Sequence, residues 1–302
     1  MRGTHLMTCS KKIFLTGATG LIGKECLPAL TAAGFCVYAV AREENPPLQT
    51  GVTWLKGNVF DEAFIREAME RIRPTHLLNL AWCANGDYAY SNANFAFLRA
   101  GLSMLESFAD NGGKRAVFAG TYMEYAQKDG ALKESDPLMS DTCYSLCKNA
   151  LRETAEVFCK LNNISFAWGR IFCVYGCREH PKRLTTSIIH TLKVGQPVEV
   201  RHSQLKRDYI YSKDIASAFT RLLDTDVSGC VNICSGRVIS LADYARTLAK
   251  LLGREDLLVL KEEPASQPSL VLGDNTRLRE EVGFCPQYSL EDGLKEILEK
   301  LA

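Results

Sequence analysis

Three closely spaced glycines near the start of the chain constrain its fold more than any other feature. Gly17, Gly20 and Gly23 follow an apolar segment at residues 12–16 and open an amphipathic segment at residues 21–33. The first segment has the length and composition of a buried strand, and the second has the periodicity of a helix. Glycines at such a junction let the backbone turn sharply and approach a ligand, and the helix N-terminus favours an anion there. This segment predicts a strand–turn–helix unit that binds the pyrophosphate of a dinucleotide.

The alternation of strand and helix continues along the first part of the chain. Further strand-like runs lie at residues 36–41, 52–55, 77–81, 116–119 and 165–168. Helical stretches lie at residues 61–72, 95–110 and 144–161, and after residue 170 only at 185–194 and 290–301. This order predicts an α/β fold with a doubly wound parallel sheet of the Rossmann type. We expect a dinucleotide-binding domain at 11–173 with 206–233, and a smaller substrate-binding domain at 174–205 with 234–302.

The composition indicates a globular protein with a small-molecule partner. The 302 residues are 46% hydrophobic, which is enough to bury a large core. With 36 basic and 35 acidic residues the net charge is +1, so no electrostatic argument favours nucleic acid or a membrane surface. No secretory signal or membrane-spanning stretch is evident, so we expect a cytoplasmic protein whose twelve cysteines are reduced. Residues 1–6 are expected to be an added leader, with Met7 as the natural start.

The end of the second predicted strand indicates which dinucleotide binds. NAD sites place an Asp or Glu there to bind the ribose hydroxyls, whereas this chain has Ala41 followed by Arg42. Without a carboxylate to repel a 2′-phosphate, and with a guanidinium to bind it, NADP(H) is favoured and NAD(H) is the alternative. The competing interpretation is that Arg42 is a solvated residue beside Glu43 and Glu44.

Tyr144 and Lys148 provide a candidate acid–base group. They lie four residues apart in a predicted helix, so their side chains share one face. A positive charge about 4–5 Å from a phenol, at an effective dielectric constant of about 20, contributes roughly 3–4 kcal/mol. That would lower the pKa of Tyr144 by about two to three, towards the range in which acid–base catalysis is efficient.

Seven segments in chain order together resemble the extended short-chain dehydrogenase/reductase family. The resemblance is to its nucleotide-sugar branch of epimerases, dehydratases and 4-ketoreductases, and it covers residues 11–302. The segments are residues 16–23, 79–81, 118–121, 144–148, 169–176, 207–214 and 231–236.

This resemblance implies a role for each candidate residue. Tyr144 would be the acid–base residue, Thr121 would hydrogen-bond the reacting sugar oxygen, and Lys148 would hold the nicotinamide ribose. Arg207 would pair with the substrate diphosphate. The implied cofactor contacts are Gly17, Thr19, Gly20, Leu21, Ile22, Gly23, Arg42, Asn58, Val59, Leu80, Ala81, Tyr144, Lys148 and Ile171. The implied substrate contacts are Thr121, Tyr122, Cys173, Arg183 and Arg207. Family members often form homodimers, here through the helices at 95–110 and 144–161.

Departures from the family pattern narrow the reaction. The family's dehydratases carry an acid one or two positions after the Ser/Thr, but here those positions are Tyr122 and Met123. Glu124 lies one step further, and on a strand-like segment such a slip turns the side chain to the other face. Epimerases of this branch hold NAD tightly with the acidic residue that Ala41 replaces.

We therefore expect NADPH-dependent reduction of the C4 ketone of a nucleoside-diphosphate 4-keto-6-deoxy sugar. The enzyme alternative is a nucleotide-sugar epimerase with no net cofactor consumption. A cofactor-sensing protein without catalysis is disfavoured, because both Tyr144 and Lys148 are present. The base stays open among CDP, GDP, dTDP and UDP.

Two further substitutions and an aromatic group lie near the predicted site. Cys173 replaces an Asn of the family pattern, and the family's Asn on the helix at 95–110 falls on Phe97, with Asn94 one turn earlier. Three aromatic residues after the fourth strand either contact a ligand or simply pack in a loop: Trp82, Tyr88 and Tyr90.

Two pairs of cysteines have a spacing that invites a metal interpretation. Cys143 with Cys147, and Cys173 with Cys177, are each four residues apart. One pair falls on the helix that carries Tyr144, whereas structural zinc sites usually pair cysteines in loops. We expect no metal.

Overall fold

A seven-stranded parallel sheet forms the centre of the larger part of the molecule. The computed structural model describes residues 10–44, 46, 48–83, 86–177 and 179–301, so the expected leader at residues 1–6 lies outside them. In the order of the sheet the strands are β12 (Gly229–Ile233), β7 (Ser165–Ile171), β5 (Arg115–Thr121), β4 (His76–Asn79), β1 (Lys12–Thr16), β2 (Cys36–Ala41) and β3 (Val52–Lys56). Every neighbouring pair is parallel, which confirms the predicted sheet.

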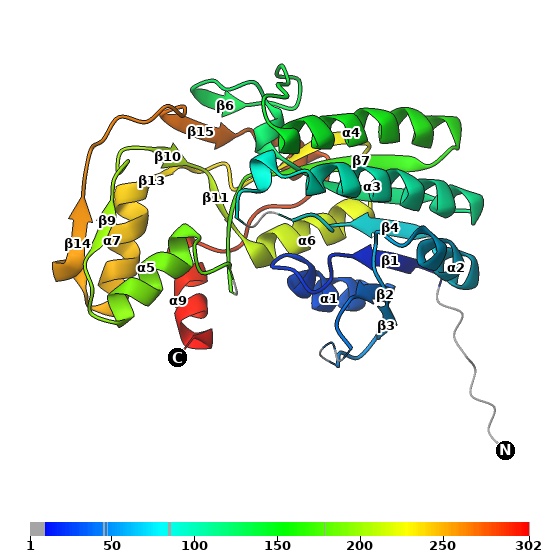
Figure 1. Ribbon diagram of the computed structural model, residues 1–302, viewed down its shortest axis with the longest axis horizontal. Coiled ribbons are helices and arrows are strands. Elements are labelled where there is room, and N and C mark those ends of the chain that lie inside the picture. The colour runs from blue at the N-terminus through cyan, green and yellow to red at the C-terminus, as the bar shows by residue number, and fades with distance from the viewer. Residues whose placement is uncertain (1–9, 45, 47, 84–85, 178, 302) are drawn as a thin grey trace.

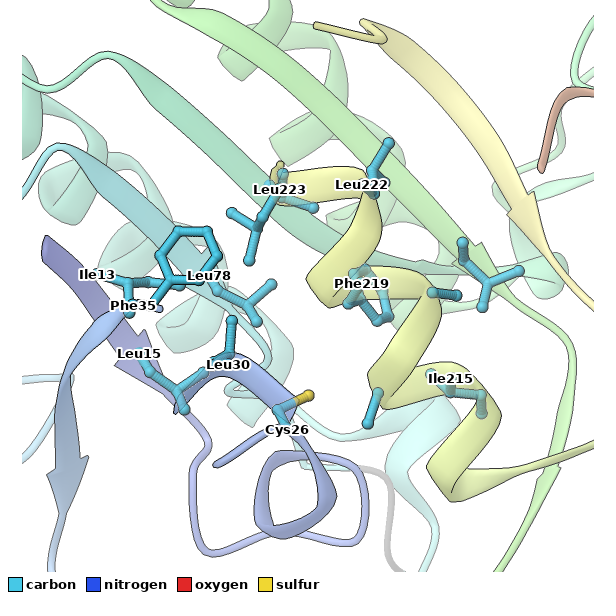
Figure 2. Packing of buried hydrophobic residues seen from close by; sticks show 14 of the residues in the cluster. Ile13, Leu15, Cys26, Leu30, Phe35, Leu78, Ile215, Phe219, Leu222 and Leu223 are labelled. Carbon is cyan, nitrogen blue, oxygen red and sulfur yellow. The ribbon is translucent and has the colours of Figure 1, made fainter. Parts of the chain in front are cut away.

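Helices cover both faces of this sheet, as its buried apolar strands require. On one face lie α1 (Gly23–Ala32) and α6 (Ser212–Leu223), and on the other α2 (Glu62–Ile72), α3 (Ala93–Asp110) and α4 (Cys143–Leu161) (Figure 1). Figure 2 shows Cys26 and Leu30 of α1 near Leu15 of β1, and Phe219 of α6 belongs to the same buried cluster. Burying one such large apolar side chain stabilises the fold by about 1.5–3 kcal/mol. The doubly wound Rossmann-type arrangement is thus confirmed.

The smaller part carries short strands and three longer helices at one end of the large sheet (Figure 1). A four-stranded sheet has the order β13 (Ile239–Ser240), β10 (Lys206–Arg207), β15 (Leu270–Gly273) and β6 (Gly130–Leu132). Two further pairs are β8 (Cys173–Tyr175) with β11 (Tyr209–Tyr211), and β9 (Val198–Val200) with β14 (Leu258–Leu260). The helices α5 (Leu184–Lys193), α7 (Leu241–Leu252) and α9 (Leu290–Lys300) share a separate core with these strands. The remaining short helices are η1 (Tyr88–Tyr90), η2 (Tyr122–Glu124), η3 (Glu255–Leu257) and α8 (Thr276–Glu280).

Two long helices, α6 and α7, were not expected from the sequence. Helix α7 begins at a cap in which the Ser240 hydroxyl accepts from the Asp243 N–H at 3.0 Å, and it ends at Gly253 with φ 63°. Both caps are ordinary start and stop signals. The expectation of mostly loops after residue 170 is therefore wrong for these two segments.

Most cysteines in the part of the chain that the structure describes are free thiols. Ten cysteines there are free, but Cys36 is disulfide-bonded, so the expectation of reduced thiols is wrong at this residue. No described helix combines the length and apolar character needed to cross a membrane. No group of three or more His, Cys, Asp and Glu side chains among these residues is placed to hold a metal ion.

Candidate active site

A cavity of about 710 Å³ lies at the carboxyl ends of the central strands. It is next to β1 and β4, where the strand order reverses, and folds of this type bind ligands at that point. Most of the predicted site residues line it: Gly17, Thr19, Gly20, Leu21, Ile22, Gly23, Leu80, Thr121, Tyr122, Tyr144, Lys148, Ile171, Cys173 and Arg183. Five predicted residues are not among those that line it: Arg42, Asn58, Val59, Ala81 and Arg207.

The glycine turn forms one wall of the cavity. Gly17 has φ 71°, and a Cβ there would lie 2.7 Å from the carbonyl carbon of Leu80. A Cβ on Gly23 would lie 2.0 Å from the Gly17 oxygen, so side chains are excluded at both positions. The turn therefore brings bare backbone and the N-terminus of α1 to the cavity, which fits the pyrophosphate of a dinucleotide.

The residue directly after β4 forms a neighbouring part of the cavity wall. The Asn79 side-chain oxygen accepts from the Thr16 hydroxyl at 2.6 Å and from the Ala81 N–H at 3.3 Å. These bonds end the strand at Asn79, two residues before the predicted end, because the amide takes the place of a ladder partner. Leu80 then lies against Gly17 and lines the cavity.

Helix α4 presents Tyr144 and Lys148 to the cavity. The Thr142 hydroxyl accepts from the Ser145 N–H at 3.0 Å and so caps the helix directly before Tyr144. Tyr144 is only 7% exposed and hydrogen-bonds to Thr121, the last residue of β5. One turn later, Lys148 Nζ donates to the carbonyl oxygen of Ala119 at 2.7 Å. The structure thus gathers the three predicted catalytic side chains at one point.

The pKa of Tyr144 departs from the expectation. Burial raises it and the charge of Tyr88 adds to this, while the hydrogen bond with Thr121 acts in the opposite direction. Burial also lowers the pKa of Lys148 to about 7, against the attraction of Glu124. The predicted lowering of the Tyr144 pKa is therefore wrong, because the lysine charge has less effect on the phenol than the loss of solvent around it.

Two of the three aromatic residues after β4 belong to the cavity. The Lys148 ammonium lies 3.9 Å from the centre of the Trp82 ring, and Tyr88 packs edge-to-face on Tyr144 at 5.0 Å. Both Trp82 and Tyr88 line the cavity, whereas Tyr90 does not and is 68% exposed.

Glu124 occupies a buried ion pair away from the cavity lining. Its carboxylate accepts from Arg170 Nε at 2.8 Å, from Trp168 Nε1 at 3.0 Å and from the Thr121 N–H at 2.8 Å. The segment that carries it is the 3₁₀ turn η2, not the strand-like segment assumed from the sequence. These bonds use the carboxylate to hold the end of β5.

The charges of two arginines, Arg183 and Arg207, act on the pKa of Cys173. Burial raises the pKa of its thiol to about 11, while a hydrogen bond with Tyr122 and the charges of Arg207 and Arg183 oppose that rise. Arg207 is only 6% exposed, and its guanidinium donates to the Lys206 oxygen at 2.8 Å. Cys173 therefore places a thiol, on which the charges of Arg207 and Arg183 both act, at the position of the amide in the family pattern.

Four predicted cofactor residues follow β2, β3 and β4 without reaching the cavity lining. Arg42 and Asn58 are exposed, and the Asn58 side chain accepts from the Phe60 N–H at 3.2 Å. Val59 is half-buried against the core of the α2–α4 face, and Ala81 donates its N–H to Asn79. All four follow the carboxyl ends of their strands, and the cavity lies on the same side of the sheet because the strands are parallel.

One cavity residue that the sequence analysis missed is Glu179. It is 7% exposed, and its carboxylate accepts from the Gly176 N–H at 3.1 Å. Burial raises its pKa to about 7, opposed by Arg183 and by hydrogen bonds with Thr185 and Gly176. Glu179 lies three residues after the segment at 169–176, and this nearness to a predicted site segment could have identified it.

Comparison with known proteins agrees with this geometry. Residues 13–234 match the model of the NAD dependent epimerase/dehydratase family. The dTDP-4-dehydro-6-deoxy-D-allose reductase of Streptomyces bikiniensis is 26% identical over 314 residues, covering 95% of this chain and 94% of the relative. The UDP-glucose 4-epimerase of Thermotoga maritima, solved with UDP-glucose, superposes with a TM-score of 0.86 at 21% identity, covering 96% and 99% of the two chains. The Thermus thermophilus UDP-glucose 4-epimerase complex with NAD gives a TM-score of 0.82 at 20% identity, covering 95% and 98%.

The family match spans most of the chain and includes the glycine turn, Thr121, Tyr144 and Lys148. It confirms the resemblance drawn from the seven sequence segments and the expectation of an NAD(P)-dependent enzyme. The chain therefore belongs to the NAD-dependent epimerase/dehydratase family, the extended short-chain dehydrogenases/reductases that act on nucleotide sugars.

Proposed function

We propose that the protein reduces the C4 ketone of a nucleoside-diphosphate 4-keto-6-deoxy sugar with NADPH. The observation that carries this proposal is the place of Tyr144 in the cavity, beside Thr121 and one helical turn before Lys148. The phenol carries its proton at neutral pH and lies where it can donate it. Its hydrogen bond with Thr121 places two hydroxyl groups beside one position for a reacting oxygen.

The proposed reaction uses each of these groups once. The glycine turn and Lys148 would hold NADPH, which when bound would supply the hydride for the carbonyl carbon. Tyr144 gives its phenolic proton to the developing alkoxide, and Thr121 hydrogen-bonds the same oxygen. Lys148 holds the ribose hydroxyls of the cofactor, and Tyr144 recovers its proton from solvent. The product is the C4 alcohol.

The acidic residue that dehydratases of the family use is missing beside Thr121, which favours reduction over loss of water. The positions directly after Thr121 carry Tyr122 and Met123, and the next acid, Glu124, is held by Arg170. The relative from Streptomyces bikiniensis carries the name of a reductase of a 4-dehydro-6-deoxy sugar nucleotide, which supports the same reaction class here.

The substrate diphosphate is proposed to lie near Cys173, between Arg183 and Arg207. Both guanidinium charges act on that thiol, and Arg183 lines the cavity. We assign residues 174–205 with 234–302 to substrate binding, and 11–173 with 206–233 to cofactor binding. Glu179, Arg183 and Thr185, all in the first substrate segment, line the cavity and support this division.

NADP(H) is the proposed cofactor, with NAD(H) as the alternative. Position 41 carries alanine, so no carboxylate at the end of β2 would repel a 2′-phosphate. Arg42 is exposed beside it, where its guanidinium can bind that phosphate.

Cofactor consumption tests the proposal directly. Purified protein is incubated with NADPH or NADH and a panel of CDP-, GDP-, dTDP- and UDP-linked 4-keto-6-deoxyhexoses, and the sugars are identified afterwards. Stoichiometric NADPH oxidation with formation of a 4-hydroxy sugar is expected. Isomerised sugars without cofactor consumption would replace the reductase by a nucleotide-sugar epimerase.

We also propose a homodimer that pairs α3 and α4 of each subunit. Large apolar side chains are exposed on these helices, namely Phe95 (43%), Leu146 (47%), Val157 (60%) and Leu161 (77%). Light scattering on the purified protein should give twice the 33.5 kDa mass of one chain, and a monomer would overturn this proposal.

A further inference from the structure

We propose that Trp82 is a positioning residue for Lys148, and that Asn94 and Phe97 hold the Trp82 ring in that position. The inference rests on the proposed function only in the task given to Lys148, which is to hold the cofactor ribose. It concerns three residues that are outside the predicted site: Trp82, Asn94 and Phe97.

The contact between Trp82 and Lys148 is short and buried. Lys148 is 4% exposed, and its ammonium lies 3.9 Å from the centre of the indole ring. Its hydrogen bond is to the Ala119 oxygen, a neutral acceptor. Glu124, whose charge acts on Lys148, is already paired with Arg170. The rings of Tyr144 and Trp168 also face the ammonium, but each is 5.8 Å away. The face of an indole is the best aromatic partner for a buried ammonium, so Trp82, as the nearest of the three rings, offsets most of the lost solvation among them.

The Trp82 ring is itself fixed at its edge and on a face. Its Nε1–H donates to the Asn94 side-chain oxygen at 2.7 Å. Phe97 stacks on it with ring centres 5.3 Å apart and an angle of 21° between the planes. An indole held in both ways has a single orientation, which fixes where the ammonium can lie.

Asn94 joins this arrangement to the Tyr144 side of the cavity. It is 2% exposed, and its amide nitrogen donates to the backbone oxygens of Tyr88 at 2.7 Å and Ser91 at 2.8 Å. Tyr88 and Trp82 pack edge-to-face on Tyr144, at 5.0 Å and 6.2 Å. The buried amide of Asn94 therefore holds the Trp82 ring directly and the Tyr88 segment through its backbone, and both rings contact Tyr144.

This arrangement explains the two departures noted on the same helix. An amide at position 97 would give Trp82 no stacking partner, and an apolar residue at position 94 would leave the indole N–H without its acceptor. Phe97 and Asn94 are thus matched to a tryptophan at position 82, and the three residues form one unit.

The first test measures Lys148 itself and needs no substrate. Acetic anhydride labels lysines in the native protein across a range of pH, and the Lys148 peptide is quantified by mass spectrometry to give its pKa. Other groups facing Lys148 are Tyr144 on the same helix, Trp168 of β7 and Glu124 from η2, and the variants change none of these three residues. Trp82→Leu should lower the pKa of Lys148 by about half to one, because the ring favours the charged form. Trp82→Phe should give a smaller shift in the same direction.

Matched variants separate positioning from general damage. Asn94→Leu and Phe97→Leu should each lower the measured pKa of Lys148 by less than Trp82→Leu does. Trp54→Phe on β3 should leave that pKa unchanged. Circular dichroism confirms that each variant is folded. An unchanged Lys148 profile in folded Trp82→Leu would overturn the inference.

The second test reads the same residue during turnover. Trp82→Leu should raise the KM for NADPH about three- to tenfold and move the alkaline limb of the kcat/KM profile to lower pH by the shift seen in labelling. If the wild-type protein turned over no 4-keto sugar while the labelling shift appeared, the proposed function would fail and the positioning role would stand. Loss of activity with an unchanged limb and KM would mean that Trp82 acts only structurally, against the inference.

Discussion

The proton on Tyr144 is the feature of a single residue on which the proposed reduction depends. Burial holds the phenol in its neutral form, which suits a proton donor better than a base. Lys148 cannot fully reverse this, because burial lowers its own pKa to about 7. Acid strength in this site is therefore set by desolvation first and by charge second.

Removing the phenolic hydroxyl should separate catalysis from binding. Tyr144→Phe should lower kcat for 4-keto sugar reduction about 10²- to 10⁴-fold, because the alkoxide loses its proton donor. Fluorescence titration should show NADPH affinity within about twofold of the wild type, since the ring and Lys148 remain. Comparable activity in Tyr144→Phe would assign the acid role to another group.

Glu179 should make stability depend on pH. Its pKa is raised from 4.5 to about 7 in the folded protein. A raised carboxyl pKa gives a contribution to stability that is complete below pH 4.5 and is lost as the pH rises through 7. Glu179→Gln keeps the shape without the charge. The variant should match the wild type at pH 4.5 and exceed its stability by about 2–3 kcal/mol at pH 8.5.

Thermal unfolding at the two pH values measures this difference. A gain of about 3–5 °C in Tm at pH 8.5 is expected for a chain of this length. Glu280→Gln, at an exposed glutamate of α8, is the matched control and should show no such pH dependence. Equal Tm values for Glu179→Gln and the wild type at pH 8.5 would show that the carboxyl is solvated.

At the scale of elements, the junction between β5 and η2 depends on a buried ion pair. Arg170 and Glu124 have side chains that are 1% and 0% exposed. Removing one partner leaves the other charge buried without compensation, which costs about 3–5 kcal/mol. Glu124→Gln should therefore lower the free energy of unfolding by about that amount in urea denaturation.

A double variant distinguishes the pair from the rest of the junction. Glu124→Gln combined with Arg170→Met removes both charges and should cost less than the sum of the two single variants. Strict additivity would mean that the two side chains do not interact in the folded protein.

Elements with a local signal could be predicted from the sequence, and elements made by distant pairing could not. The unit β1–α1–β2 was predictable because the apolar runs and the glycines of one short segment define it. Strand β10 (Lys206–Arg207) has two residues and exists only through β13 and β15, so no periodicity reveals it. Helices α6 and α7 carry ordinary amphipathic patterns, and α7 also has a cap at each end, so their omission was avoidable.

Some residues of the candidate site could likewise be predicted from local sequence, and others could not. Residues at strand ends, such as Thr121 after β5, could be placed because parallel strands bring their carboxyl ends together. The pKa of Tyr144 and the cavity position of Glu179 depend on burial by segments far apart in the sequence. Contacts of that kind appear only in the folded molecule.

At the scale of the whole molecule, the cavity takes its walls from both parts of the structure. The glycine turn and α4 belong to the large sheet, whereas Glu179 and Arg183 precede α5 in the smaller part. Ligands that bind here should therefore stabilise the molecule as a unit. At 100 times its Kd, NADPH should stabilise by about 2.7 kcal/mol and raise Tm by about 4 °C.

A nucleoside diphosphate provides the complementary probe. dTDP or UDP should give its own Tm increase, which should add to that of NADPH. Arg183→Ala should reduce the nucleotide shift while leaving the NADPH shift intact, if the diphosphate lies near Cys173. A loss of both shifts would place Arg183 in a structural role.

The origin of β6 has a practical consequence for recombining this chain with its relatives. β6 (Gly130–Leu132) is encoded between β5 and α4, yet it pairs with β15 near the end of the chain. A chimaera that joins the first 233 residues to the remaining C-terminal segment of a relative would keep one edge strand from one parent and its neighbour from the other. Libraries that exchange substrate preference should therefore swap the β6 loop together with that C-terminal segment, even though Leu132 and Leu270 lie 138 positions apart in the sequence.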